Sequence, residues 1–120
     1  IQIAGQSYPI ASDARVKNTI ENETLGLEFI NKVRPRSFYY NNQPDQLAHG
    51  IVAQELVELI PPSQFWGIVE PKNSEDIYKV RKEEFVGPLI KAIQELTTEV
   101  RALRTRVVDL EAEVSHLKNI

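Results

Sequence analysis

The stretch that decides the architecture is residues 89–117, LIKAIQELTTEVRALRTRVVDLEAEVSHL. Its apolar residues recur at alternating steps of four and three, which is the a/d pattern of a coiled coil sustained for about four heptads. A single helix would leave this seam in water, and burying each Leu or Val is worth roughly 1.5–3 kcal/mol. The sequence therefore predicts partner helices along Leu89, Ile93, Leu96, Val100, Leu103, Val107, Leu110, Val114 and Leu117.

The charges beside the seam indicate how the helices are oriented. With Leu at d and Val or Ile at a, a parallel, in-register neighbour brings g and e residues of opposite sign together. In an antiparallel pair, the signs would agree only for a chosen stagger. We therefore predict a parallel homo-oligomer held by the pairs Glu99–Arg104, Arg106–Glu111 and Glu113–Lys118.

Two residue patterns in the seam favour different numbers of helices. Val or Ile at a with Leu at d leans towards two strands. Residues 106–111, RVVDLE, instead place Arg at g and Glu at e around two apolar positions, a pattern known from three-stranded coiled coils. This pattern, together with the resemblance described below, favours a trimer.

Composition limits the classes of function. The chain has 120 residues, and the roughly 85 before the helix form a small core for which oligomerisation is a natural remedy. The absence of cysteine excludes a disulfide scaffold and a thiolate metal site, and the net charge of −3 argues against a nucleic-acid surface. No run approaches the roughly 18 apolar residues of a membrane span. Since the chain starts at Ile1 and has no Met, we expect a fragment of a longer polypeptide.

The remaining pattern predicts an α+β fold: a small mixed helix/strand domain followed by a long C-terminal helix that forms a parallel trimeric coiled coil. Helix-start signals, apolar runs and prolines set the expected boundaries. The expected elements are a strand or arm at 1–10, a helix at 12–20, a helix at 25–33 capped by Thr24, a strand at 37–40, a turn at 41–45, a buried strand at 49–52, a helix at 53–59, and strands at 67–69 and 77–80.

The segment SDARVK, residues 12–17, has the most chemical content. Its simplest interpretation is a capped helix, because Ser and Asp are common at helix starts. The alternative makes Ser12 a nucleophile and Lys17 its base, since the lysine stem can fold back about one turn to the helix start. A lysine takes a proton from a hydroxyl only if burial lowers its pKa towards neutrality. Spacing alone leaves both interpretations open.

Three blocks in order decide between them. SDARVKNTIENETLGLEFINKVRPRSFYY, then HGIVAQELVELIP, then IYKV before the heptads, resemble the intramolecular chaperone auto-processing domain, also classed as peptidase family S74. That domain ends phage tail spikes, tail fibres and endosialidases, and also lies within the metazoan myelin regulatory factor. The resemblance runs from Ser12 to the C-terminus.

The resemblance implies a chaperone that trimerises, helps its upstream region to fold, and then releases itself with a Ser–Lys dyad. By position the nucleophile is Ser12, the base is Lys17, and the scissile bond is Ala11–Ser12. Residues 1–11 would be the end of the client, residues 12–85 the chaperone domain and residues 86–120 the coiled coil. Attack by Ser12 on its own preceding carbonyl is favoured, and attack from a neighbouring subunit is the alternative.

Other residues have possible supporting roles. Asp13 would cap the helix or orient Lys17, and His49 would polarise the scissile carbonyl or satisfy a buried hydrogen bond. Gln54 and Glu55 match family positions, and helix-start capping is an equal alternative. With two histidines and no cysteine, we expect no metal site, and with no glycine-rich phosphate loop we expect no cofactor.

The expected partners are two further copies of the chain and the upstream client, with no nucleic acid and no membrane. The expected location is the host cytoplasm during virion assembly, with release from the virion after cleavage. Two alternatives remain: a trimerisation module without chemistry, and the same self-cleaving domain within a membrane-bound transcription factor.

Overall fold

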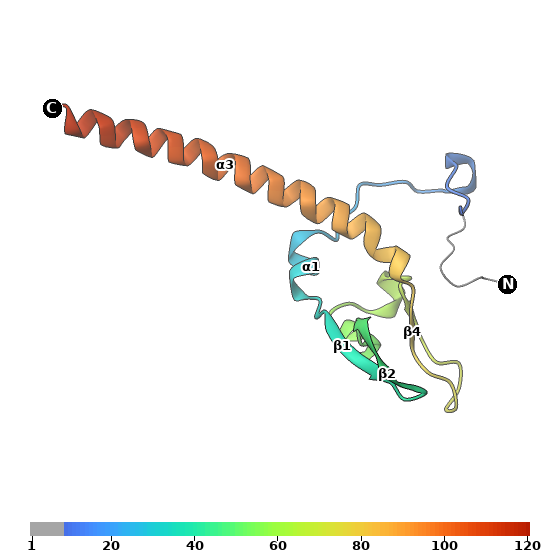
Figure 1. The fold of residues 1–120 in the computed structure, drawn as a ribbon. Coiled ribbons are helices and arrows are strands. Elements are labelled where there is room, and N and C mark those ends of the chain that lie inside the picture. The colour runs from blue at the N-terminus through green and yellow to red at the C-terminus, as the bar shows by residue number, and fades with distance from the viewer. Residues whose placement is uncertain (1–8) are drawn as a thin grey trace.

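The protein is a small mixed helix/strand body from which one long helix projects (Figure 1). The structure, a computed structural model, describes residues 9–120, so the predicted strand or arm at residues 1–10 lies mostly outside it. Its extents of 75 × 44 × 30 Å reflect the projecting helix. The elements in order are η1 (Ala14–Val16), α1 (Leu27–Lys32), β1 (Arg36–Tyr40), β2 (Gln43–Gly50), α2 (Ala53–Val57), η2 (Pro62–Gln64), β3 (Ile68–Val69), β4 (Lys79–Val80), η3 (Lys82–Phe85) and α3 (Val86–Lys118).

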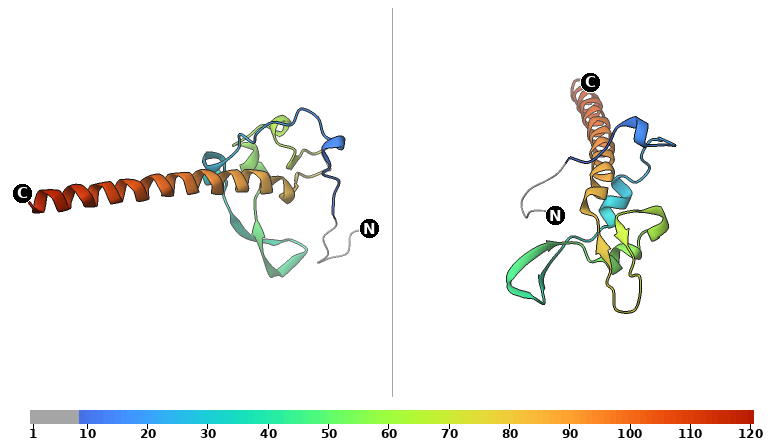
Figure 2. Two further views of the ribbon diagram at one scale, coloured as in Figure 1. Left: turned by 90° about the horizontal axis from the view of Figure 1, so that it is seen from above. Right: turned by 90° about the vertical axis from the view of Figure 1, so that its right-hand side faces the viewer.

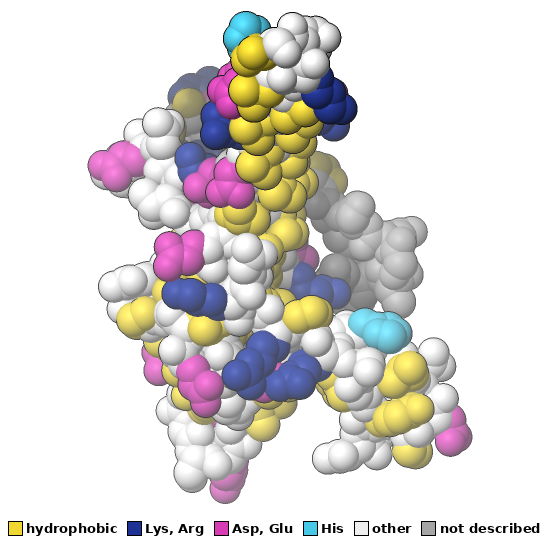
Figure 3. Space-filling view, turned by 90° about the vertical axis from the view of Figure 1, so that its left-hand side faces the viewer, with side chains coloured by type: hydrophobic (Ala, Val, Ile, Leu, Met, Phe, Trp, Pro, Cys, Tyr) yellow, Lys and Arg dark blue, Asp and Glu magenta, His cyan; other side chains and the backbone are white. Residues whose placement is uncertain are grey.

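The predicted long C-terminal helix is confirmed as α3, which has 33 residues and would span roughly 50 Å at 1.5 Å per residue. Pro88 lies in its first turn, where a missing backbone N–H breaks no helical hydrogen bond. Only its beginning packs against the body, through buried Pro88 and Ala92. All nine seam residues are exposed in the single chain, by 37–66%. Figure 3 shows a hydrophobic stripe that runs along the helix.

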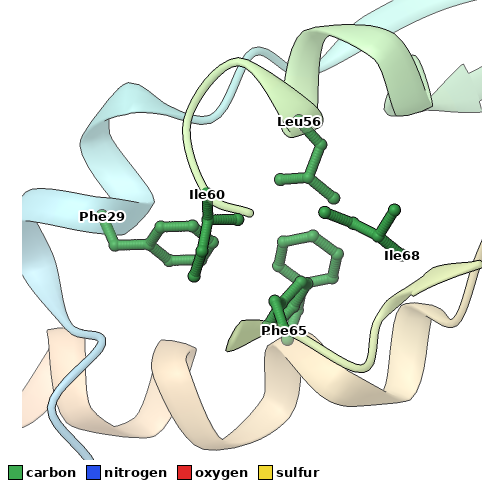
Figure 4. Packing of buried hydrophobic residues seen from close by; sticks show 6 residues of the cluster. Phe29, Leu56, Ile60, Phe65 and Ile68 are labelled. Carbon is green, nitrogen blue, oxygen red and sulfur yellow. The ribbon is translucent and has the colours of Figure 1, made fainter. Parts of the chain in front are cut away.

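The core lies between α1, α2 and the start of α3 (Figure 4). Phe65 packs against Phe29 and Phe85 with ring centroids 5.7 and 5.1 Å apart, in the tilted and edge-to-face arrangements that aromatic pairs prefer. The aliphatic members are Leu56, Ile60 and Ile68. Leu56 is the most enclosed of them at 1% exposed, so the single chain buries few large side chains completely.

The β1–β2 hairpin is antiparallel and pairs Ser37 with His49 and Tyr39 with Leu47, with a bulge after Tyr39. The strand predicted at 37–40 is confirmed. The turn predicted at 41–45 was too long, because β2 already begins at Gln43 and includes Pro44. Proline is tolerated there because a two-stranded ribbon has free edges. The strand predicted at 49–52 is confirmed only for His49 and Gly50, which end β2, and its predicted burial was wrong because the residues of β2 are exposed or half-buried.

A contact between α1 and α3 holds the body to the long helix. The backbone N–H of Leu27, at the start of α1, donates a 3.0 Å hydrogen bond to Glu95 Oε1 on α3. Gly26 makes this approach possible, because a Cβ there would overlap the Glu95 carboxylate and lie 2.9 Å from Lys91 Cγ. The predicted cap Thr24 was therefore wrong. The residue that caps α1 comes from 68 positions further along the chain.

Two further predictions concern the segments around the core. The strands predicted at 67–69 and 77–80 are confirmed as the antiparallel pair β3 and β4, although each has only two residues. The helix predicted at 12–20 was too long. Only the three residues of η1 are helical, because Lys17 is extended and Thr19 has a left-handed φ of 50°.

Candidate active site

The site begins with a short turn that Asp13 stabilises. Asp13 is the N-cap of η1, and its Oδ1 accepts a 2.8 Å hydrogen bond from the Arg15 backbone N–H. The Arg15 guanidinium donates to both carboxylate oxygens, at 3.0 and 2.8 Å. These bonds hold the pKa of Asp13 below its usual value. Asp13 is thus occupied by capping and by Arg15.

The capping by Asp13 leaves the Ser12 hydroxyl free for another partner. Lys17 Nζ donates a 2.7 Å hydrogen bond to Ser12 Oγ. The turn brings the two together, since the backbone N–H groups of Val16 and Lys17 bond back to Asp13 and Ala14 at 3.1 and 3.2 Å. A hydroxyl and an amine at this distance have the geometry that proton transfer from a nucleophile to a base requires.

The surroundings of this pair are open to solvent. Every residue from 9 to 24 is exposed, and we call this segment the N-terminal arm. Its apolar residues Ile10, Val16 and Ile20 are 79, 65 and 69% exposed. The single chain therefore supplies the Ser–Lys contact without the burial that a lysine needs in order to act as a base.

His49 and Gln54 are not brought to Ser12. Both line a groove of about 800 Å³ between the hairpin, the start of α2 and the segment around β4. His49 is exposed, so it does not fill the predicted buried hydrogen-bonding role. In both views of Figure 2, η1 and the hairpin lie apart.

Glu55 has a different partner from the ones considered from sequence. Arg36, at the start of β1, donates two hydrogen bonds of 2.9 and 2.6 Å to the Glu55 carboxylate. Arg34 Nη1 lies 3.5 Å from Glu55 Oε2. This bidentate pair lowers the pKa of Glu55 and raises that of Arg36. Glu55 thus ties α2 to the hairpin, and it neither caps α2 nor contacts Ser12. Its spacing from Arg36 gave no periodic signal in the sequence.

One family model matches part of the chain. Residues 12–63 match the family model of Peptidase_S74, the chaperone of endosialidase, and the match begins at Ser12. It ends before β3, so α3 lies outside it. A search of curated proteins found no match. Residues 12–63 are therefore similar to the chaperone of endosialidase domain of the S74 family, and residues 64–120, to which the sequence motifs extended the resemblance, lie outside the match.

Residues 9–120 contain neither a metal-binding cluster nor a membrane-spanning helix. In this described part, no cluster of three or more His, Cys, Asp or Glu side chains is arranged to hold a metal ion. No helix among the same residues is long and apolar enough to cross a membrane.

Proposed function

We propose that this chain is a C-terminal intramolecular chaperone that trimerises an upstream phage tail spike or fibre and then cuts itself off between Ala11 and Ser12. The observation that carries the proposal is the 2.7 Å contact between Lys17 Nζ and Ser12 Oγ at the first residue of the S74 domain. The similarity of residues 12–63 to a peptidase family supports self-cleavage as the use of such a pair.

The chemistry follows from the position of Ser12 directly after the bond it cuts. Ser12 Oγ gives its proton to neutral Lys17 Nζ and attacks the carbonyl carbon of Ala11 through a five-membered ring. The C–N bond breaks, the proton passes from Nζ to the leaving Ser12 nitrogen, and an ester joins Ala11 to Ser12 Oγ. Water then hydrolyses the ester, which leaves a carboxyl group on Ala11 and a free amine on Ser12.

On this proposal, assembly of the trimer both aligns the upstream chains in register and buries the Ser12–Lys17 pair. Three copies joined along the seam would hold three upstream ends at high effective concentration and in register. Intertwined β structure folds slowly because its contacts are non-local, so such alignment would help a spike or fibre most. The proposed place of action is the host cytoplasm during virion assembly, and the chaperone is released after cleavage.

The proposal is tested on the chain carrying an N-terminal affinity tag, by intact-mass spectrometry and denaturing gel. Wild type should lose the tag with residues 1–11, and Ser12→Ala and Lys17→Ala should each stay whole. Ser74→Ala and Lys72→Ala make the same changes at exposed sites elsewhere and should cleave normally.

The possible outcomes separate the alternatives. A trimer that never cleaves would support a module without chemistry, and cleavage that survives in Lys17→Ala would overturn the dyad. Mixed trimers of Ser12→Ala and Lys17→Ala chains separate attack within one chain from attack between chains. Attack within a chain leaves both uncut, because neither chain has a complete pair.

A further inference from the structure

The groove that contains His49 is an apolar surface that no other part of residues 9–120 fills. Its walls include Phe38, Tyr40, Ile51, Val52, Ile77 and Leu89. Ile77 is 68% exposed and Val52 39%, so these side chains face open space in the single chain. Among residues 9–120, the charged side chains in the lining are Lys79 and Lys82, and none of these residues brings a carboxylate to it.

The N-terminal arm has complementary properties. Its three large apolar residues, Ile10, Val16 and Ile20, are exposed. Glu21 follows Ile20 and is opposite in sign to the two lysines of the groove. An apolar segment followed by an acidic residue is the chemistry that an apolar groove with basic residues accepts.

The groove and the root of the arm both lie near the start of α3, and this position favours a neighbouring chain as the source of the arm that fills the groove. Leu89 lines the groove and is also the first seam residue, so the groove adjoins the face that other copies would cover. The root of the arm lies at the same end of α3, since a Cβ on Gly87 would be 3.5 Å from Glu23 Oε2. Packed helices are roughly 8–10 Å apart. The 11 residues from Ser12 to Asn22 can extend to roughly 36–40 Å, which is long enough to reach a neighbour.

We propose that the groove of each chain receives residues 10–20 of a neighbouring copy, so that the Ser12–Lys17 pair is buried between two subunits. The inference rests on the trimer of the proposed function. Docking would cover Val16 and Ile20, exclude water from Lys17, and bring His49 and Gln54 of one chain to Ser12 of the next. His49 would then act as a positioning residue supplied by the neighbouring copy.

Cross-linking tests the docking without relying on cleavage. The chain has no cysteine, so engineered thiols are unique. Chains with Val16→Cys and differently tagged chains with Ile77→Cys, all in a Ser12→Ala background, are co-assembled and oxidised. A disulfide between the two kinds of chain is expected. Leu47→Cys is the matched control, because Leu47 is an exposed apolar residue of the hairpin that does not line the groove.

The cross-linking experiment has outcomes that would contradict the proposed docking. Cross-linking at Ile77 no stronger than at Leu47 would overturn the docking, and sedimentation of the same sample shows whether the trimer itself had formed. The double variant Val16→Cys/Ile77→Cys, diluted into cysteine-free chains, distinguishes the arm's own groove from a neighbour's. Closure within a single chain would contradict the proposal.

Cleavage in mixed trimers gives a second test. Ile77→Glu should slow cleavage about tenfold or more, since a tenfold change corresponds to about 1.4 kcal/mol of lost docking. Leu47→Glu should have little effect. Chains with Ile77→Glu and an intact dyad should be rescued by excess Ser12→Ala chains, whose grooves are intact. If the cleavage rate of a chain instead depended on the groove of that same chain, the proposed docking of the arm on a neighbouring copy would be wrong.

Discussion

Two adjacent valines on α3 provide a matched test of the seam. Val107 is an a position and Val108 lies beside it off the seam; they are 52 and 64% exposed in the single chain. Val→Ala removes the same atoms at both sites and improves helix propensity equally, by roughly 0.5 kcal/mol. The difference between Val107→Ala and Val108→Ala therefore isolates the packing between helices.

The size of that difference follows from the exposed fraction of Val107. Two carbon groups are worth roughly 1.6 kcal/mol when fully buried, at about 0.8 kcal/mol each. Because about half of the side chain is already covered in the single chain, assembly supplies roughly 0.8 kcal/mol per chain. Over three chains this is about 2.4 kcal/mol, or roughly a 50-fold weaker monomer–trimer association constant for Val107→Ala than for Val108→Ala.

Sedimentation equilibrium over a range of concentrations measures this constant and also counts the chains. The seam should give a mass of three chains for wild type and both variants at high concentration. Equal constants for Val107→Ala and Val108→Ala would refute the seam as the interface. A limiting mass of two chains would show that the coiled coil is a dimer, as Val or Ile at a with Leu at d favours.

The remaining predictions concern the contacts that hold the body together. Gly26→Ala should lower the thermal unfolding midpoint much more than Gly87→Ala, because a Cβ at Gly26 overlaps the Glu95 carboxylate whereas one at Gly87 meets nothing closer than 3.5 Å; similar midpoints would show that Glu95 is free to move away. Arg36 lowers the pKa of Glu55, so the pair adds stability above the unfolded glutamate pKa of about 4.3 and loses it as pH falls through the lower folded value. Arg36→Ala should therefore flatten the acid dependence of unfolding and raise the Glu55 pKa in an NMR titration, and an unchanged pKa would contradict the assignment.

Sequence periodicity predicted the parts of the fold that depend on local pattern. The long helix α3 was predictable because its heptad seam continues through nine apolar positions, and strand β1 because consecutive aromatic residues favour extended backbone. The extent of β2 was missed because Pro44 and Asp45 carry turn signals that an edge strand tolerates. The Glu95 cap of α1 has no local signal, because its partners are 68 residues apart.

The candidate site shows the same division. Asp13 as a cap and the reach of Lys17 to Ser12 both follow from spacing within one turn, and the structure contains both contacts. The groove draws its walls from β1, β2, α2, β4 and α3, so no stretch of sequence indicates it. The separation between the groove and Ser12 in the single chain could not be predicted from the sequence either, because it depends on the direction that the exposed arm takes.

The exposed features of the single chain suggest an order of events. The Ser12–Lys17 contact forms within six residues, so it needs no partner. The seam, the groove and the arm each leave apolar surface in water, and association is the step that would cover all three. A dyad assembled locally but buried only by association would stay inactive until three chains are in register. On the proposed function, cleavage then removes the helices that aligned the client and with them the easy path back to separate chains, which leaves the product kinetically stable.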